Sequence, residues 1–203
     1  MAIVSGAAFA KTWTNHIGVG VGVPVESVKP KDGEGDSIFQ AGFMFDATYI
    51  GVHENGFTVK AGFDTGALAS DDVELEVIDK NETQTGAFVA FNFGAGYSFV
   101  RTEKVLFGTT AMFTYAYNQY EKKDVDYGEE GKFTNKMEFG TLGIGADVFG
   151  SLALTNHFGL YANLGIRYIF GGTAATEIAG EKVDADLKGN VLVLPSLGVM
   201  WRF

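Results

Sequence analysis

The sequence predicts an all-β fold, an eight-stranded antiparallel up-and-down transmembrane β-barrel, and three observations predict it. Apolar side chains alternate with polar or small ones along eight segments, which is the period of a β-strand. Each segment is longer than the usual soluble strand of about 5–6 residues and suits a tilted bilayer span. Long and short connections alternate strictly, as in a meander whose closure removes both sheet edges.

The last segment, residues 190–203, shows this alternation most clearly. Its second face mixes polar, small and apolar residues such as Asn190, Ser196 and Arg202. Its first face is wholly apolar and ends in two aromatic residues at the C-terminus: Val191, Val193, Pro195, Leu197, Val199, Trp201 and Phe203.

The other seven strands are expected, in chain order, over residues 13–25, 37–52, 57–70, 87–100, 105–120, 137–154 and 158–171. In each of them glycine and polar residues occupy the face opposite the apolar one. The apolar faces carry, strand by strand, Ile17, Val19, Val21 and Val23; Phe39, Phe43 and Phe45; Phe57, Val59 and Phe63; Val89, Phe91 and Phe93; Phe107, Phe113 and Tyr115; Leu142, Ile144 and Val148; and Leu160, Leu164, Ile166 and Tyr168.

The connections between these strands fall into two classes. Short turns are expected after the second, fourth and sixth strands, including the Glu54-Asn55-Gly56 and Thr155-Asn156-His157 turns. Long loops are expected at residues 26–36, 71–86, 121–135 and 172–189, and they hold most of the acidic side chains.

Composition excludes several classes of protein. The net charge of -10 argues against nucleic acid as a partner, because phosphate binding needs a basic surface. The chain has no cysteine, so disulfide and thiol chemistry are absent. No run of about 18 apolar residues could form a transmembrane helix, but barrel strands give a much weaker hydropathy signal.

The N-terminus differs from the rest of the chain. Residues 2–10 read as the end of an apolar segment followed by the small-x-small site Ala8-Phe9-Ala10, although no basic region precedes it. We therefore expect residues 1–10 to be the remnant of a signal peptide and residues 11–203 to form a single barrel domain.

The apolar face must lie outside the barrel rather than around a soluble ligand. The chain contains 18 Phe, 8 Tyr and 2 Trp, most of them on the apolar face, whereas an eight-stranded interior is only wide enough for side chains to fill it. The opposite face, rich in glycine, suits a crowded lumen, and it carries too few charges for a soluble exterior.

With this pattern, residues 11–203 resemble the small eight-stranded outer-membrane proteins of the OmpX, OmpW and OmpA-barrel kind. The resemblance implies short turns and both termini in the periplasm, long loops outside the cell, and bacterial outer-membrane lipid around a monomer. In that class, a terminal aromatic residue after alternating apolar residues resembles the signal that the barrel-assembly machinery reads. In this chain the residues that match this pattern are Leu197, Val199, Trp201 and Phe203.

Ionisable residues on the inward face are the first candidate site. If the two short turns have three residues each, Asp46 faces Asp64 across one strand pair, and Arg167 lies opposite Gly145 and diagonal to Asp147. Two facing carboxylates need a cation or a shared proton. The inward ionisable residues predict one of three things: a structural polar plug, a proton or ion path, or a gate in which Arg167 exchanges partners. These residues are His16, Asp46, Lys60, Asp64, Asp147, Arg167 and Arg202.

The acidic loops are the second candidate. They can be a solvated rim, an adhesive surface for a basic host molecule, or a loose site for divalent cations that lacks the spacing of a defined calcium loop. The densest acidic patch comprises Asp71, Asp72, Glu74, Glu76, Asp79 and Glu82.

Catalysis is not expected, and neither a cofactor nor a resident metal is implied. His16, His53 and His157 are all predicted at the short-turn end, away from the outer rim. The predicted function is adhesion, host interaction or envelope integrity through the loops. The alternative function is a narrow OmpW-like channel for small hydrophobic or ionic solutes, which the apolar residues on the inward face would allow. These residues are Met44, Leu68, Phe88, Met112, Phe139, Phe149 and Ile169.

Overall fold

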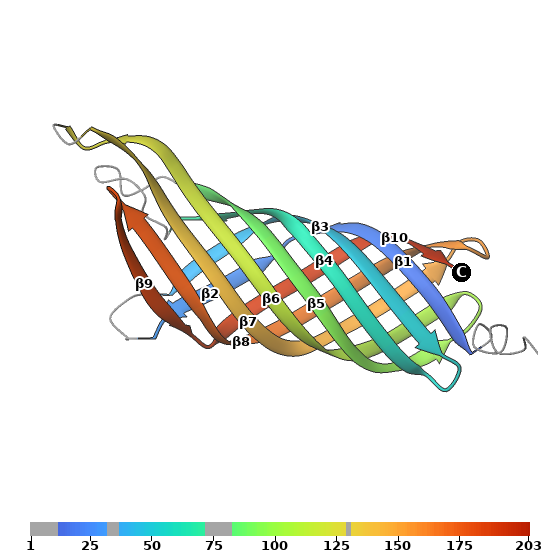
Figure 1. Cartoon of the computed structure of the whole chain (residues 1–203). Helices are drawn as coiled ribbons and strands as arrows, with labels where there is room; N and C mark the ends of the chain where they lie inside the picture. Colours follow the sequence, from blue (N-terminus) through green and yellow to red (C-terminus); the bar gives the residue numbers. More distant parts are fainter. Residues whose placement is uncertain (1–11, 32–36, 72–82, 129–130) are drawn as a thin grey trace, which may run out of the picture.

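The computed structural model describes residues 12–31, 37–71, 83–128 and 131–203. They form one antiparallel sheet that closes on itself, because β1 pairs with both β3 and β10 (Figure 1). The strands are β1 (Trp13–Gly22), β2 (Val25–Pro30), β3 (Ile38–His53), β4 (Phe57–Ser70), β5 (Gln84–Arg101), β6 (Val105–Asp126), β7 (Lys132–Ala153), β8 (Phe158–Ile178), β9 (Glu181–Lys188) and β10 (Asn190–Arg202).

The ten strands make up an eight-stranded barrel in which two strands are interrupted. β1 and β2 run one after the other between the same neighbours, β3 and β10, and are separated at Val23-Pro24. Proline has no N–H to donate to the ladder, which explains this break. β9 and β10 likewise both pair with β8 and are separated at Gly189. The predicted fold class is confirmed, and the strand count differs only through these two breaks.

The short turns set the register that the sequence predicts. The Gly56 N–H donates to the His53 carbonyl oxygen at 2.8 Å in the β3–β4 turn. Across this turn Asp46 lies directly opposite Asp64. Across the β7–β8 turn Gly145 lies opposite Arg167.

The predicted boundaries of three long loops are wrong, because the strands continue through much of them. β2 continues to Pro30, β6 continues to Asp126, and β7 already begins at Lys132. β8 and β9 form a hairpin that turns at Ala179–Gly180. Backbone pairing does not require an apolar face, so charged strands can continue into water where alternation of hydropathy stops. Of the remaining loop, residues 72–82 lie outside the described residues.

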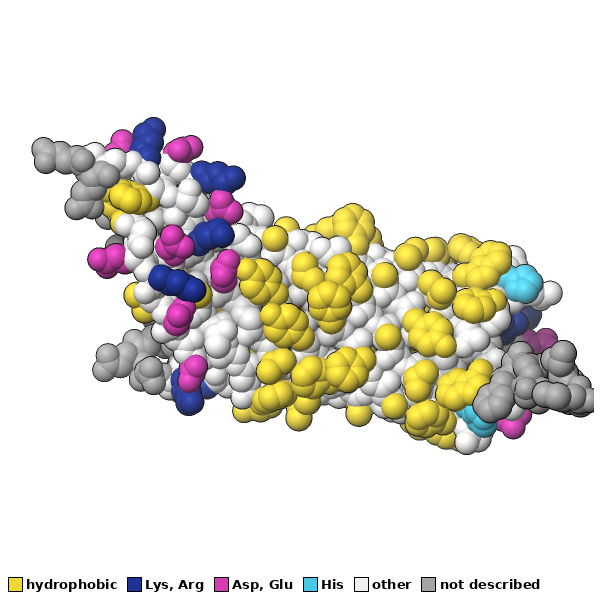
Figure 2. All heavy atoms as spheres, in the orientation of Figure 1, with side chains coloured by type: hydrophobic (Ala, Val, Ile, Leu, Met, Phe, Trp, Pro, Cys, Tyr) yellow, Lys and Arg dark blue, Asp and Glu magenta, His cyan; other side chains and the backbone are white. Residues whose placement is uncertain are grey.

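The outer surface carries the apolar face, as predicted. Figure 2 shows a band of apolar side chains over the body of the barrel, with charged side chains gathered where the β6–β7 and β8–β9 hairpins project. We call this the loop end and the opposite end, with the short turns, the turn end. The described residues include no helix long and apolar enough to span a membrane. Outward side chains include Ile17, Phe45, Phe91, Phe93, Phe99, Ile144, Leu164, Ile166 and Tyr168.

Candidate functional site: the filled lumen

The lumen is filled by two apolar clusters with a charged layer between them. Along β3, Met44 belongs to the cluster nearer the loop end, Asp46 to the charged layer, and Ile50 to the cluster nearer the turn end. The loop-end cluster also contains Leu68, Phe88, Tyr120, Phe139, Ile169 and Leu192. The turn-end cluster also contains Val52, Leu106, Phe149, Tyr161 and Met200.

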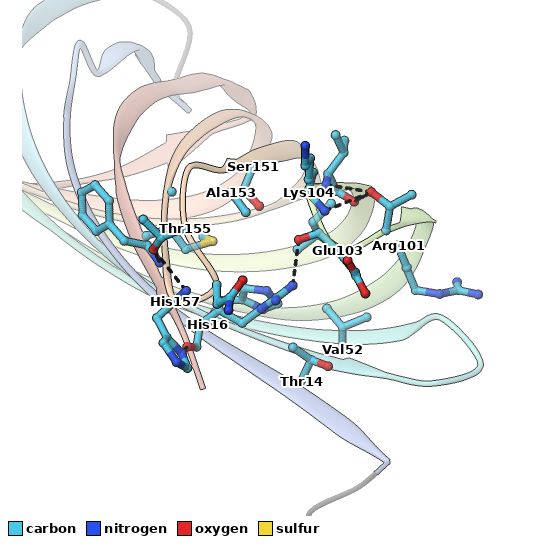
Figure 3. Close-up of a pocket in the computed structure, with 18 of the residues that line it drawn as sticks. Thr14, His16, Val52, Arg101, Glu103, Lys104, Ser151, Ala153, Thr155 and His157 are labelled. Atoms are coloured by element: carbon cyan, nitrogen blue, oxygen red, sulfur yellow. Dashed lines mark hydrogen bonds between the residues drawn. The ribbon is translucent and has the colours of Figure 1, made fainter.

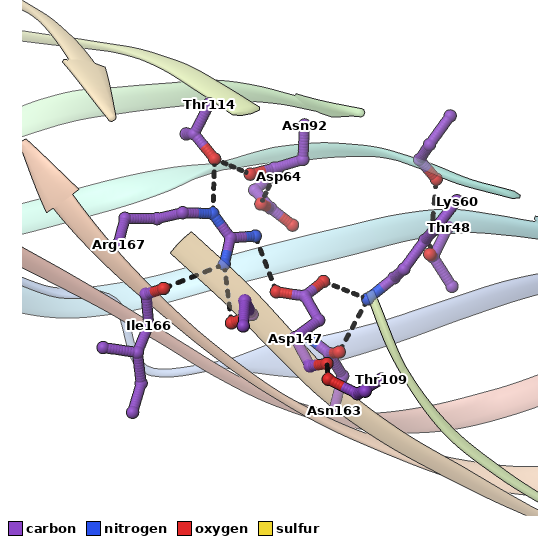
Figure 4. Close-up of polar contacts among 12 residues, drawn as sticks. Thr48, Lys60, Asp64, Asn92, Thr109, Thr114, Asp147, Asn163, Ile166 and Arg167 are labelled. Atoms are coloured by element: carbon purple, nitrogen blue, oxygen red, sulfur yellow. Dashed lines mark hydrogen bonds and ion pairs between the residues drawn. The ribbon is translucent and has the colours of Figure 1, made fainter. Parts of the chain in front are cut away.

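Asp147 is the centre of the charged layer. Its carboxylate forms an ion pair with Lys60 from β4 and another with Arg167 from β8, at 2.6 Å from the Arg167 Nη2 atom (Figure 4). Lys60 Nζ also donates to Asn163 Oδ1 at 2.6 Å. All three charged side chains are at most 5% exposed, so these ion pairs are shielded from water.

A chain of hydrogen bonds connects this ion-pair group to the acid pair on the other wall. Arg167 Nε donates to Thr114 Oγ1 at 2.6 Å, and the Thr114 hydroxyl donates to Asn92 Oδ1 at 2.6 Å. Asn92 Nδ2 then donates to Asp64 Oδ2 at 2.7 Å. The structure thus brings five of the predicted inward residues into one layer: Asp46, Lys60, Asp64, Asp147 and Arg167.

Arg202 and His16 lie outside that layer, in a cavity of about 270 Å³ at the turn end (Figure 3). Arg202 Nη1 donates to the Glu103 carbonyl oxygen at 3.1 Å, and His16 Nδ1 lies 3.3 Å from the Ile50 carbonyl oxygen, within hydrogen-bond distance. His53 and His157 also line this cavity. Within the described ranges, no three His, Asp or Glu side chains are grouped to hold a metal ion.

Glu26 is an inward residue that sequence reasoning missed. The sequence predicts it in a solvated loop, but β2 carries it into the lumen, where it is fully buried. Asn118 Nδ2 donates to one of its carboxylate oxygens, and Thr141 Oγ1 donates to the other at 3.1 Å. The available signal was the alternation itself, because Val25 faces outward and the next residue must then face inward.

The other predicted site residues lie on the surface or outside the described ranges. In the acidic patch, Asp71 is exposed and accepts a hydrogen bond from Thr83 Oγ1 at 2.5 Å, whereas Asp72, Glu74, Glu76, Asp79 and Glu82 lie outside the described residues. The four residues of the predicted assembly signal all point outward from the barrel: Leu197, Val199, Trp201 and Phe203.

Sequence comparisons give no relative: no family model matches the chain, and no curated protein matches it. Solved structures do match. A major outer membrane protein from Thermus thermophilus has a TM-score of 0.58 at 16% identity, covering 92% of this chain and 99% of that one. The outer membrane protein OprG from Pseudomonas aeruginosa has a TM-score of 0.58 at 11% identity, covering 95% and 96%.

The outer membrane protein AlkL, solved in lipid bilayers, has a TM-score of 0.54 at 14% identity and covers 95% of this chain and 90% of that one. At such low identity these likenesses establish the fold. The chain has the fold of the small bacterial outer-membrane β-barrel proteins that it matches, and its apolar outer band is the kind of surface that such a barrel presents to lipid.

Proposed function

We propose that the protein is a closed membrane anchor that acts at the cell surface through its loop end, in adhesion, host interaction or envelope integrity. In this proposal the loop end is extracellular, the molecule is a monomer, and no catalysis is involved. The filled lumen is the single observation that carries the proposal, because a barrel without a passage is left with its surface as the working part.

The charged layer leaves little room for a solute. The cavity within it has a volume of about 10 Å³, which is about the space that one water molecule needs. A solute would have to separate Lys60 and Arg167 from Asp147, and breaking a buried ion pair costs about 3–5 kcal/mol. The two apolar clusters block the lumen above and below this layer.

The loop end offers a polar contact surface that carries charges of both signs. Its ion pairs are exposed and long, such as Lys31 with Asp186 at 3.4 Å and Lys182 with Asp184 at 3.7 Å. Exposed pairs of this kind contribute only about 0–1 kcal/mol, so these charges remain available to a partner. Because the chain carries a net charge of -10, a basic host surface molecule is the partner that the charge favours.

The proposal is tested by shortening the two projecting hairpins while leaving the barrel intact. In one variant, a two-residue Asn-Gly turn replaces residues 123–134 of the β6–β7 hairpin. In the other variant, the same turn replaces residues 176–183 of the β8–β9 hairpin. We expect each to fold as a barrel and to lose binding of bacteria to host cells. Gly62→Ala, inside the lumen, is the control that should keep binding, because an added Cβ atom there would be in ordinary contact at 3.6 Å. Full binding by both shortened variants would refute the surface role.

One observation favours transport as a second candidate. The half of the lumen nearest the loop end contains an apolar cluster that includes Phe88, Phe139 and Ile169, and such side chains suit small hydrophobic solutes better than ions. Uptake of such a solute by cells that carry the protein, abolished by substitution of the lumen and not by shortening of the hairpins, would favour this function over adhesion.

A further inference from the structure

The Asp46–Asp64 pair differs from every other charged group in the central layer. The two carboxyl-bearing residues lie directly opposite each other on β3 and β4, and both are buried. In the part of the chain that the structure describes, neither forms an ion pair, because Lys60 and Arg167 both pair with Asp147 instead. Two acids therefore share one wall of the lumen without a cation of the protein paired with them.

Two buried oxygen atoms in the charged layer have neither a hydrogen-bond nor an ion-pair partner among the described residues. They are Oδ1 of Asp46, whose residue is 8% exposed, and Oγ of Ser196, whose residue is 4% exposed. Asp46 and Ser196 line the same cavity of about 10 Å³ in the charged layer, one from β3 and the other from β10. Leaving buried polar atoms unpaired is costly, so the cavity lacks a partner of about the size of one water molecule or small ion.

The charge count fixes the charge of that partner. The charged side chains lining the cavity are the acids Asp46, Asp64 and Asp147 and the bases Lys60 and Arg167. If all are ionised, the layer carries one uncompensated negative charge, which is very unfavourable out of water. One positive charge restores neutrality, whereas a divalent ion would leave an excess of one.

From these three observations we propose that Asp46 and Asp64, with Ser196, form a binding site for a single monovalent cation, either a proton or an alkali-metal ion. A cation bound at this site makes the charged layer in the lumen neutral overall. Occupancy of the site couples the stability of the barrel to the concentration of that cation, because the unfolded chain, with its carboxylates in water, lacks the site.

The test uses the full chain refolded in zwitterionic lipid vesicles, with urea unfolding followed by tryptophan fluorescence. One arm varies pH from 6 to 9 in choline chloride. The other holds pH constant and replaces choline with sodium or potassium at constant ionic strength. While the site is saturated, the equilibrium constant for unfolding should rise about tenfold for each tenfold fall in the concentration of the bound cation.

Asp46→Asn is the diagnostic variant, because it leaves Asp64 and Asp147 balanced by Lys60 and Arg167. The equilibrium constant for unfolding of this variant should therefore no longer depend on the concentration of the cation. Asp64→Asn replaces it as the diagnostic variant if Asp46→Asn does not fold. Asp184→Asn, which removes an exposed acid, should keep the dependence. A dependence on pH alone identifies a proton, and a dependence on sodium or potassium at constant pH identifies an alkali ion. Unfolding that is flat in both arms, or a dependence that Asp46→Asn retains, would overturn the proposal.

Discussion

At the scale of single residues, the lumen depends on a few buried polar side chains whose partners come from distant strands. Asp147 on β7 is held by Lys60 on β4 and Arg167 on β8. Glu26 on β2 is held by Asn118 on β6 and Thr141 on β7. A buried polar group of this kind is stable only while its partners remain, so removing one partner has a larger effect than the net strength of the interaction.

Asp147→Asn removes the carboxylate that both buried cations, Lys60 and Arg167, contact. We expect the free energy of unfolding to fall by about 3–5 kcal/mol, because Lys60 and Arg167 are left buried without an acid in contact. Urea unfolding in lipid vesicles measures it. Asp184→Asn, whose ion pair is exposed, should change the same quantity by about 0–1 kcal/mol. Equal effects of the two variants would mean that the buried ion pairs do not stabilise the barrel.

Glu26 should act as a hydrogen-bond acceptor. Glu26→Ala leaves the amide of Asn118 and the hydroxyl of Thr141 without this partner, so we expect a loss of about 1–3 kcal/mol in the free energy of unfolding. Glu26→Gln keeps an acceptor oxygen and the side-chain length, and it should be more stable than Glu26→Ala in the same assay. The two variants would be equally stable if Glu26 only filled space.

At the scale of strands, the close approach of neighbouring backbones restricts which inward residues can be larger than glycine. A Cβ atom at Gly145 would overlap the Ile166 carbonyl oxygen and lie 2.9 Å from the Cα atom of Arg167. At Gly62, on the same inward face, the nearest atom to a Cβ would be in ordinary contact at 3.6 Å. The two glycines therefore occupy very different surroundings.

Gly145→Ala should force β7 and β8 apart and displace Arg167. Overpacking of this kind costs about 1–3 kcal/mol, so the free energy of unfolding should fall by that amount. Gly62→Ala, the matched control, should change it by less than about 1 kcal/mol because nothing needs to move. Thermal unfolding of the two refolded variants compares them, and a Gly145→Ala barrel as stable as Gly62→Ala would disprove the close packing.

The last strand carries a prediction about assembly. Phe203 points outward, and its backbone exchanges hydrogen bonds with Asn15 at 3.0 and 3.1 Å. We propose that it belongs to the signal read by the barrel-assembly machinery, so its deletion should lower the amount of protein in the outer membrane more than the stability of refolded protein. Quantifying membrane fractions and unfolding side by side measures both, and normal membrane levels of the deletion variant would contradict the prediction.

At the scale of the whole molecule, alternation predicted the faces of the strands, and the short turns predicted the register of Asp46 with Asp64 and of Gly145 with Arg167. The contact between Lys60 and Asp147 could not be predicted. These residues lie on non-adjacent strands, and only the closure and stagger of the barrel decide which side chains meet across it. The extended hairpins were missed because their strands have no apolar face. Glu26 was missed because the predicted loop begins at this residue, although the alternation continues through it into β2.

The conductance of the refolded barrel in planar lipid bilayers tests the central claim, a closed anchor rather than a channel. The filled lumen predicts a silent protein, with no steps of current above those of the lipid alone, for the unmodified chain and for both shortened hairpins. Reproducible channels in the unmodified chain, with a conductance that Lys60→Met or Asp147→Asn changes, would contradict the account and establish the lumen as a pathway.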